Sequence, residues 1–208
     1  MYSNLTLKDF LAKLSSSDPT PGGGAASSIT SAMGFALLKM VLSVSYKKNS
    51  DGKINKLINI VDEYINFSLE NATLDAESFD RVMAAYKLPK QTDEEKQLRR
   101  NAIEEALKEA TTVPFSLIEK LYESSNLIAE TSNVCIDSIA SDFFTAISLF
   151  DTAMSGARSV VLINLKLIKD RDFVKSTFSK LESTKKEFDN LINDLKNKFD
   201  AKLKLSEE

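Results

Sequence analysis

The sequence predicts an all-α protein, built as an up-and-down bundle of about six long helices. Apolar residues recur at spacings of three and four through most of the chain, and no stretch shows the strict alternation of a half-buried strand. Glycine and proline, which interrupt regular structure, are scarce, with 6 and 4 copies in 208 residues. A chain of this length is typical of one domain, so we treat residues 1–208 as a single helical unit.

The composition restricts the function. The net charge is −3 and the charges are mixed along the chain, so no basic block predicts nucleic-acid binding. Histidine is absent and Cys135 is the single cysteine, which argues against a metal site and against an internal disulfide. Without histidine, proton transfer must use Asp, Glu, Lys or Tyr. No signal peptide and no membrane-spanning run is expected, so we predict a cytoplasmic protein. We also predict that it needs no cofactor.

Local signals place the first three helices at residues 6–15, 25–46 and 53–86. The first has Phe10 and Leu14 on one face. The second is rich in alanine, serine and glycine, which let neighbouring backbones approach closely, so we expect it at the centre of the bundle. The third carries an apolar stripe of more than eight turns that includes one carboxylate, Asp75.

The second half of the chain gives three more helices. Thr92 and Glu95 form a capping box for the fourth, and Pro114 is expected to kink or end it before a further break at Ser132-Asn133. The fifth helix carries its stripe over residues 136–168. The last covers residues 171–203 and is charged on all but one face, so it packs that face and solvates the rest.

The segment Pro19-Thr20-Pro21-Gly22-Gly23-Gly24 holds half of all the glycines, directly before the small-residue helix. Gly-Gly-Gly permits close approach of another group, and the free N–H groups of a helix start favour an anion. This pattern therefore indicates an anion-binding turn. The alternative is a helix start in which glycine serves tight packing only.

Four polar residues interrupt or flank the apolar stripes. Asp75 and Asn164 occupy stripe positions, and a buried carboxylate must find partners, either in a site or in a satisfied core. Asp142 and Arg158 flank the fifth stripe. Asp142 has an alternative interpretation as a surface charge favoured by the helix dipole.

The chain resembles the cyclodeaminase/cyclohydrolase family, which includes the C-terminal domain of formiminotransferase-cyclodeaminase and stand-alone methenyltetrahydrofolate cyclohydrolases. The resemblance covers nearly the whole chain. The residues that carry it are Pro19-Thr20-Pro21-Gly22-Gly23-Gly24, Asp75, Phe79-Asp80-Arg81-Val82-Met83-Ala84-Ala85, Leu88-Pro89-Lys90, Arg100, Pro114, Asn133, Ser141-Asp142, Gly156-Ala157 and Ile163-Asn164-Leu165.

The resemblance implies a helical homodimer that acts on a folate without a metal, with its site near the dimer interface. It makes Asp142 and Asp75 candidates for the carboxylates that hold a cationic methenyl group and orient water. Lys90 joins them as a candidate that meets a carboxylate of the substrate or of the enzyme. The implied substrate-binding residues are Pro21, Gly22, Gly23, Gly24, Asn133, Asn164 and Arg158.

Two reactions fit this family. A cyclohydrolase adds water to 5,10-methenyltetrahydrofolate to give 10-formyltetrahydrofolate, and a cyclodeaminase closes 5-formiminotetrahydrofolate and releases ammonia. Because no formiminotransferase domain is present in this sequence, we favour the cyclohydrolase. The alternatives are the cyclodeaminase, a folate-binding protein without activity, and a helical interaction module without a pocket.

Overall fold

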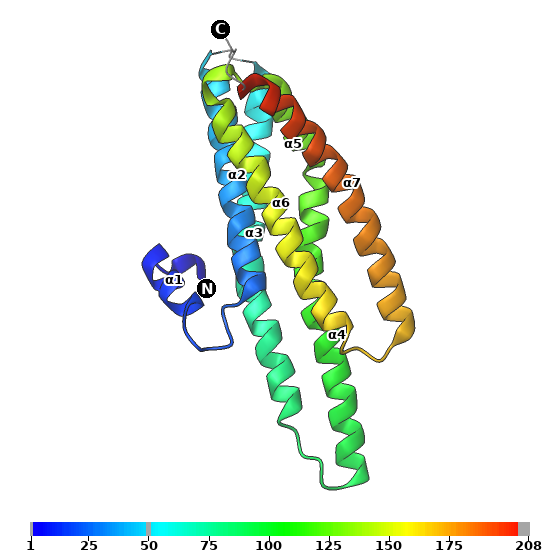
Figure 1. Ribbon diagram of the computed structural model, residues 1–208. Helices are drawn as coiled ribbons and strands as arrows, with labels where there is room; N and C mark the ends of the chain where they lie inside the picture. The colour runs from blue at the N-terminus through cyan, green and yellow to red at the C-terminus, as the bar shows by residue number, and fades with distance from the viewer. Residues whose placement is uncertain (1, 49–50, 204–208) are drawn as a thin grey trace.

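The computed structural model describes residues 2–48 and 51–203. Within them, five long helices form the molecule, with two short helices and two 3₁₀ turns beside them (Figure 1). Their bounds are η1 Tyr2–Asn4, α1 Leu7–Leu14, α2 Gly23–Lys48, α3 Gly52–Tyr86, α4 Asp93–Glu123, α5 Ser125–Val134, η2 Asp137–Ile139, α6 Ala140–Leu165 and α7 Arg171–Leu203.

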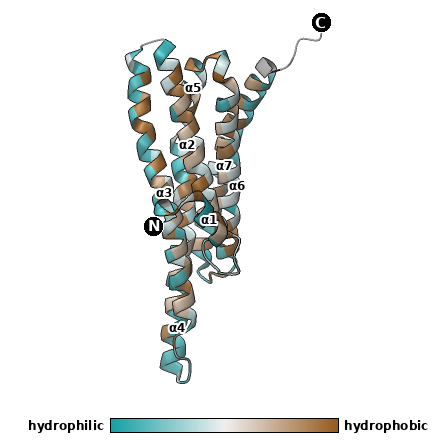
Figure 2. Ribbon diagram, turned by 90° about the vertical axis from the view of Figure 1, so that its left-hand side faces the viewer, coloured by the Kyte–Doolittle hydropathy of each residue, from teal (hydrophilic) through white to brown (hydrophobic). Residues whose placement is uncertain are grey.

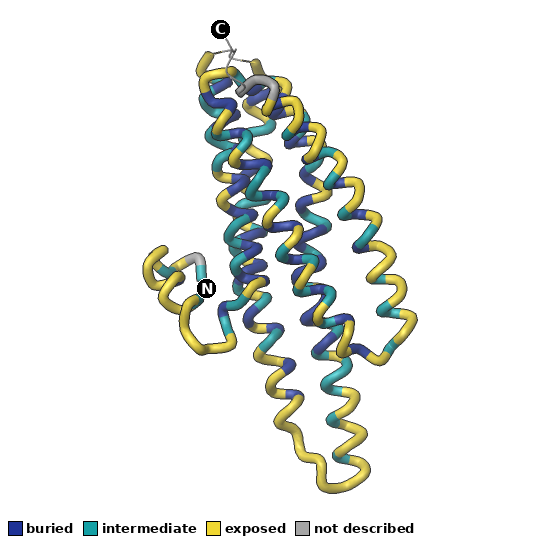
Figure 3. The backbone as a smooth tube through the Cα atoms, in the orientation of Figure 1, coloured by how far each residue is buried: buried dark blue, intermediate teal, exposed yellow. Residues whose placement is uncertain are grey.

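The long helices run alternately up and down, which confirms the predicted all-α bundle (Figure 1). Helix α2 packs most extensively on α3 and α6, so the small-residue helix is central as expected. The C-terminal part of α3 and the first turns of α4 project beyond the other helices as an arm (Figure 1). The arm is largely exposed (Figure 3), and its tip is mainly hydrophilic (Figure 2).

The starts of α3 and α4 agree closely with the local signals in the sequence, whereas α6 begins at Ala140 rather than near residue 136. The side chain of Asp51 caps α3 by accepting from the N–H of Lys53, at 2.9 Å. Thr92 and Glu95 form the predicted capping box of α4. Because a cap satisfies N–H groups through side chains only a few residues away, it can be predicted from the sequence before the fold is known.

Two expected interruptions differ from the structure. Helix α4 continues through Pro114 and ends at Glu123, so the proline neither ends the helix nor begins a new one. The additional break lies at Ser124, whose hydroxyl donates to the carbonyl of Leu121 at 2.7 Å. The break that was expected at Ser132-Asn133 follows just after Val134, where α5 ends.

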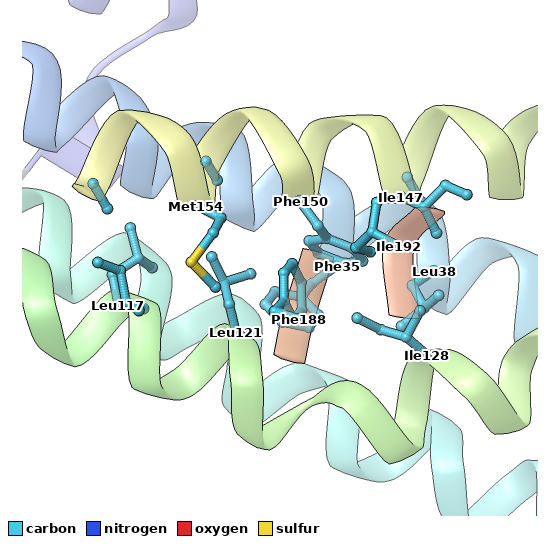
Figure 4. Packing of buried hydrophobic residues seen from close by; sticks show 14 of the residues in the cluster. Phe35, Leu38, Leu117, Leu121, Ile128, Ile147, Phe150, Met154, Phe188 and Ile192 are labelled. Atoms are coloured by element: carbon cyan, nitrogen blue, oxygen red, sulfur yellow. The ribbon is translucent and has the colours of Figure 1, made fainter. Parts of the chain in front are cut away.

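The hydrophobic core lies between α2, α4, α6 and α7. Phe35 of α2 is buried beside the ring of Phe150 of α6, with ring centroids 4.6 Å apart. Phe188 of α7 and Leu121 of α4 enter the same space (Figure 4). Gly34 is required here because a Cβ at this position would come within 2.6 Å of the Phe150 ring.

Two segments are more apolar than expected from the sequence. Helix α2 and residues 137–165 each contain an 18-residue window that is strongly apolar, with mean hydropathies of 1.5 and 1.3, and each segment is long and apolar enough to cross a membrane by length and composition alone. The expectation that no such run exists is therefore corrected. Core helices of soluble proteins pass the same test, and 56% of the apolar window of α2 is buried inside this bundle.

Candidate functional site

A mainly apolar cleft of about 330 Å³ lies where α2 begins, α6 ends and α3 and α4 continue into the arm. Its polar groups include the Asp75 carboxylate and the Asn164 amide, and no lysine or arginine is among the described residues that line it. The lining residues are Pro19, Thr20, Gly22, Gly23, Gly24, Asp75, Ser78, Phe79, Val82, Met83, Tyr86, Leu107, Ala110, Val160, Ile163, Asn164 and Leu167.

The glycine turn and Asp75 form one structural unit. The carboxylate of Asp75 lies against the first turn of α2 and accepts a hydrogen bond from the backbone N–H of Ala25. A Cβ on Gly24 would stand 2.0 Å from Asp75 Oδ1, so only glycine leaves room for this carboxylate. The group at this helix start is therefore a carboxylate of the chain itself, where the sequence indicated a site for a bound anion.

The environment of Asp75 shifts its acid strength. Burial among apolar side chains raises the pKa of the carboxyl from 3.8 to about 6, against the opposing effect of the Ala25 N–H. At neutral pH the group is mostly ionised, yet it accepts a proton more readily than an exposed aspartate. Such a carboxyl in a cleft is suited to proton transfer.

Asn164 reaches the cleft from the last turn of α6. Its side-chain Nδ2 donates to the backbone carbonyl of Ala110 in α4, at 2.7 Å. Asn164 is half-buried, and both Asn164 and Ala110 line the cleft. The structure thus brings Asp75, Asn164 and the glycine turn together, although 89 residues separate the two polar side chains in sequence.

A buried polar layer supports the wall of α2 and α3 next to the cleft. Asn71 is 2% exposed, and its amide donates to the Val113 carbonyl at 3.1 Å and to the Ser116 hydroxyl at 2.9 Å. Its Oδ1 accepts from the hydroxyl of Ser28, at 3.0 Å. Because every polar group of Asn71 has a partner, this layer holds the two helices in register.

The other predicted site residues do not line this cleft. Asp142 lies in the first turn of α6, about 33 Å along that helix from Asn164 at 1.5 Å per residue. Asn133 is exposed near the end of α5, and Lys90 is exposed in the turn that joins α3 to α4. Arg158 forms an ion pair with Glu182 of α7, at 2.7 Å.

Pro21 takes a different place from its neighbours in the turn. It follows a cis Thr20–Pro21 peptide bond and is buried, while Pro19 and Thr20 line the cleft. It therefore lies behind the turn and supports it.

The apolar wall of the cleft was not identified from the sequence. Phe79, Met83 and Tyr86 belong to the apolar stripe of α3, and none of them was a predicted site residue. Met83 and Tyr86 are each 40% exposed because α3 continues past the end of α2 at this point. Across the cleft, Ile163 and Leu167 are 55% and 53% exposed. The available signal was that this stripe is longer than the helix it packs against.

Comparison with known proteins identifies the family. The family model described as formiminotransferase-cyclodeaminase matches residues 6–183 of this chain. The chain belongs to the formiminotransferase-cyclodeaminase family. A stand-alone member is similar over nearly its whole length: the methenyltetrahydrofolate cyclohydrolase of Methylorubrum extorquens is 37% identical over 192 residues, which cover 88% of this chain and 89% of the relative.

Longer members of the family share the same region. The formimidoyltransferase-cyclodeaminase of Mus musculus is 30% identical over 86% of this chain, which spans 34% of that relative's length. The crystal structure of formiminotetrahydrofolate cyclodeaminase from Thermotoga maritima superposes with a TM-score of 0.87 at 27% identity. This match covers 97% of this chain and 98% of that structure. The fold and family expected from the sequence are both confirmed.

Proposed function

We propose that this protein is a methenyltetrahydrofolate cyclohydrolase, which converts 5,10-methenyltetrahydrofolate and water to 10-formyltetrahydrofolate. The observation that carries the proposal is the half-buried Asp75 carboxylate in an apolar cleft whose described lining contains no lysine or arginine. Such a cleft favours a flat, cationic ligand, because the carboxylate offsets its positive charge where water does not. The similarity to the Methylorubrum extorquens cyclohydrolase supports the same reaction.

Asp75 is the proposed general base. The oxygen of a water molecule bonds to the methenyl carbon while the carboxylate takes one proton from it. The bond from that carbon to N5 then breaks, the second proton of the water ends on N5, and the formyl group stays on N10. One proton is released per turnover. A carboxyl with a pKa near 6 can accept this proton at neutral pH and pass it to solvent.

The cleft suits the pterin end of the folate. Apolar side chains such as Phe79 and Ile163 cover the faces of a ring, while Asp75 and Asn164 meet its polar edge. Because Asp75 takes the Ala25 N–H, we place the pterin rather than the glutamate tail beside Gly22, Gly23 and Gly24. Lys90 and Arg158 remain candidates for the anionic tail outside this cleft, and Asp142 and Asn133 for contacts completed by a partner subunit.

Loss of methenyltetrahydrofolate, followed by its absorbance, tests the proposal directly. We expect turnover that depends on enzyme concentration and yields 10-formyltetrahydrofolate. The Thermotoga maritima structure favours one second candidate, cyclodeaminase activity, so ammonia release from 5-formiminotetrahydrofolate is measured in parallel. Faster turnover of the formimino compound would overturn the cyclohydrolase assignment. If the protein binds either folate without turnover, it is an inactive folate-binding protein. If it neither binds nor converts a folate, it is a helical interaction module.

We also propose that the protein is a homodimer that joins through α2 and α6. Both helices are apolar enough to be covered on all sides, yet only 39% of the apolar window in residues 137–165 is buried within one chain. On α2, Met33 is 46% exposed. Light scattering should give twice the chain mass, and Met33→Lys should shift it toward the monomer. A monomeric wild type at micromolar concentration would refute the dimer.

The proposed chemistry uses a carboxylate and water, with no cofactor or metal. No group of three or more metal-ligating side chains is present in the described part of the chain. Turnover should therefore survive exhaustive chelation, and restoration of lost activity by a divalent ion would contradict this.

We further propose that the protein acts in the cytoplasm, where a fluorescent fusion should be found.

A further inference from the structure

Pro114 leaves one carbonyl of α4 without its usual donor. In a regular helix the N–H of each residue donates to the carbonyl four positions earlier, but proline has no N–H. The helix nevertheless continues through Pro114, which is buried, so the carbonyl of Ala110 needs another donor. The missing donor lies directly at the cleft, because Ala110 is one of its lining residues.

Asn164 supplies that donor from α6. Its Nδ2 lies 2.7 Å from the Ala110 carbonyl oxygen. A carbonyl oxygen can only accept, so this contact determines the orientation of the amide: the NH₂ group faces α4 and Oδ1 faces away from it. Oδ1 has no hydrogen-bond partner among the described residues, and it is not among the side-chain atoms that are buried without one. It is therefore an open acceptor at the cleft.

Building on the proposed function, we infer that Pro114 is a positioning residue for folate binding. It keeps the Ala110 carbonyl free for Asn164 and so holds Oδ1 as an acceptor for a donor N–H of the pterin. Asp75 provides a second acceptor in the same cleft, and a reduced pterin displays several N–H donors along its edge. Without this constraint the Asn164 amide can rotate, and a rotated amide presents a donor where the ligand also has one.

Pro114→Ala tests the inference because it restores a helical N–H for the Ala110 carbonyl. We expect KM for methenyltetrahydrofolate, and Kd for 5-formyltetrahydrofolate measured by calorimetry, to rise about 3- to 10-fold, the range for one net hydrogen bond. The change in kcat should stay below about 2-fold, since the chemical step does not use this contact. The melting temperature should hold or rise, because proline is unfavourable inside a helix.

A double-mutant cycle with Asn164→Ala separates positioning from general damage. Asn164→Ala should raise Kd by a similar factor and lower the melting temperature, because the Ala110 carbonyl loses its donor. Adding Pro114→Ala to that variant should recover the melting temperature without a further rise in Kd. If the two changes in Kd simply multiplied, or if Pro114→Ala left Kd unchanged, the inference would be overturned.

Asn71→Ala is the matched control. Asn71 also donates to a carbonyl of α4 beside the proline, that of Val113, but it does not line the cleft. This variant should lose stability while Kd for 5-formyltetrahydrofolate stays within about 2-fold of wild type. An equal rise in Kd would show that any weakening of α4 reduces binding, which would overturn the specific role of Pro114. Wild-type protein that binds no folate would refute the proposed function itself, whereas a wild-type affinity that Pro114→Ala leaves intact would refute only this inference.

Discussion

The start and the middle of α2 use glycine for different purposes. At the cleft end, Gly24 admits the carboxylate of Asp75 to within a distance that a Cβ would occupy. Ten residues later, Gly34 admits the aromatic ring of Phe150 in the same way. One close approach buries a charged group and the other buries an apolar one. The comparison shows that glycine spacing alone does not distinguish a site from a core.

The difference between the start and the middle of α2 lies in electrostatics. The ring of Phe35 stacks on Tyr64, with centroids 4.9 Å apart, and lies tilted against Phe150 at 4.6 Å, and neither contact involves a charged group. Asp75 is held with its pKa raised to about 6 by burial, so its ionised form opposes folding. The packing at the middle of α2 thus stabilises the fold, whereas the buried charge at its start destabilises the fold. The two positions can therefore be tested separately.

The largest effect is expected from Asp75→Asn. The amide keeps the shape and can still accept from Ala25, but it cannot take a proton, so kcat should fall by about 10²-fold or more. The melting temperature at pH 8 should rise by several degrees, because the variant buries no charge. Steady-state kinetics and calorimetry measure both. Near-full turnover would remove Asp75 from the mechanism and leave Asp142 as the candidate carboxylate.

Gly24→Ala and Gly34→Ala compare the start and the middle of α2 directly. Each new methyl group would overlap a neighbour, Asp75 Oδ1 at 2.0 Å or Phe150 Cε1 at 2.6 Å. Both variants should lose about 1–3 kcal/mol of unfolding free energy, as overpacked sites do. Only Gly24→Ala should also lower kcat/KM more than about 10-fold, because it displaces the carboxylate. Equal losses of activity would mean that the cleft has no special dependence on Gly24.

The pH dependence of stability and of activity should run in opposite directions. The folded pKa of Asp75, about 6, exceeds the unfolded value of 3.8. Its stabilising contribution is therefore complete below about pH 4 and is lost as the pH rises through 6, at most about 3 kcal/mol at 1.36 kcal/mol per pKa unit. As a base it must be ionised, so kcat/KM should rise over the same interval. Asp75→Asn, compared with wild type by chemical denaturation, should lack this loss of stability.

Asp142→Asn should have the smallest effect. Asp142 lies in the first turn of α6, where a carboxylate near the helix dipole contributes under about 1 kcal/mol. Its distance from the cleft within one chain predicts near-normal kcat. A fall of 10²-fold with an unchanged melting temperature would show that a second subunit brings this carboxylate to the site.

The sequence by itself determined the helical class, the starts of α3 and α4, and the family. Caps such as Asp51 and the Thr92–Glu95 box act within one turn, and the apolar period reports which face of a helix is covered. The same period placed Asp75 on a buried face. These features depend on residues close together in the chain.

Only the tertiary structure decided which polar residues meet. Asp75 reaches the start of α2, and Asn164 reaches Ala110, because α2, α3, α4 and α6 pack in one particular register. Asp142 appeared the more plausible carboxylate from the sequence, yet it lies at the opposite end of α6 from Asn164. Periodicity specifies a face but not the height at which two helices cross. Interdigitation of side chains such as Phe35 and Phe150 sets that height, and with it the composition of the cleft.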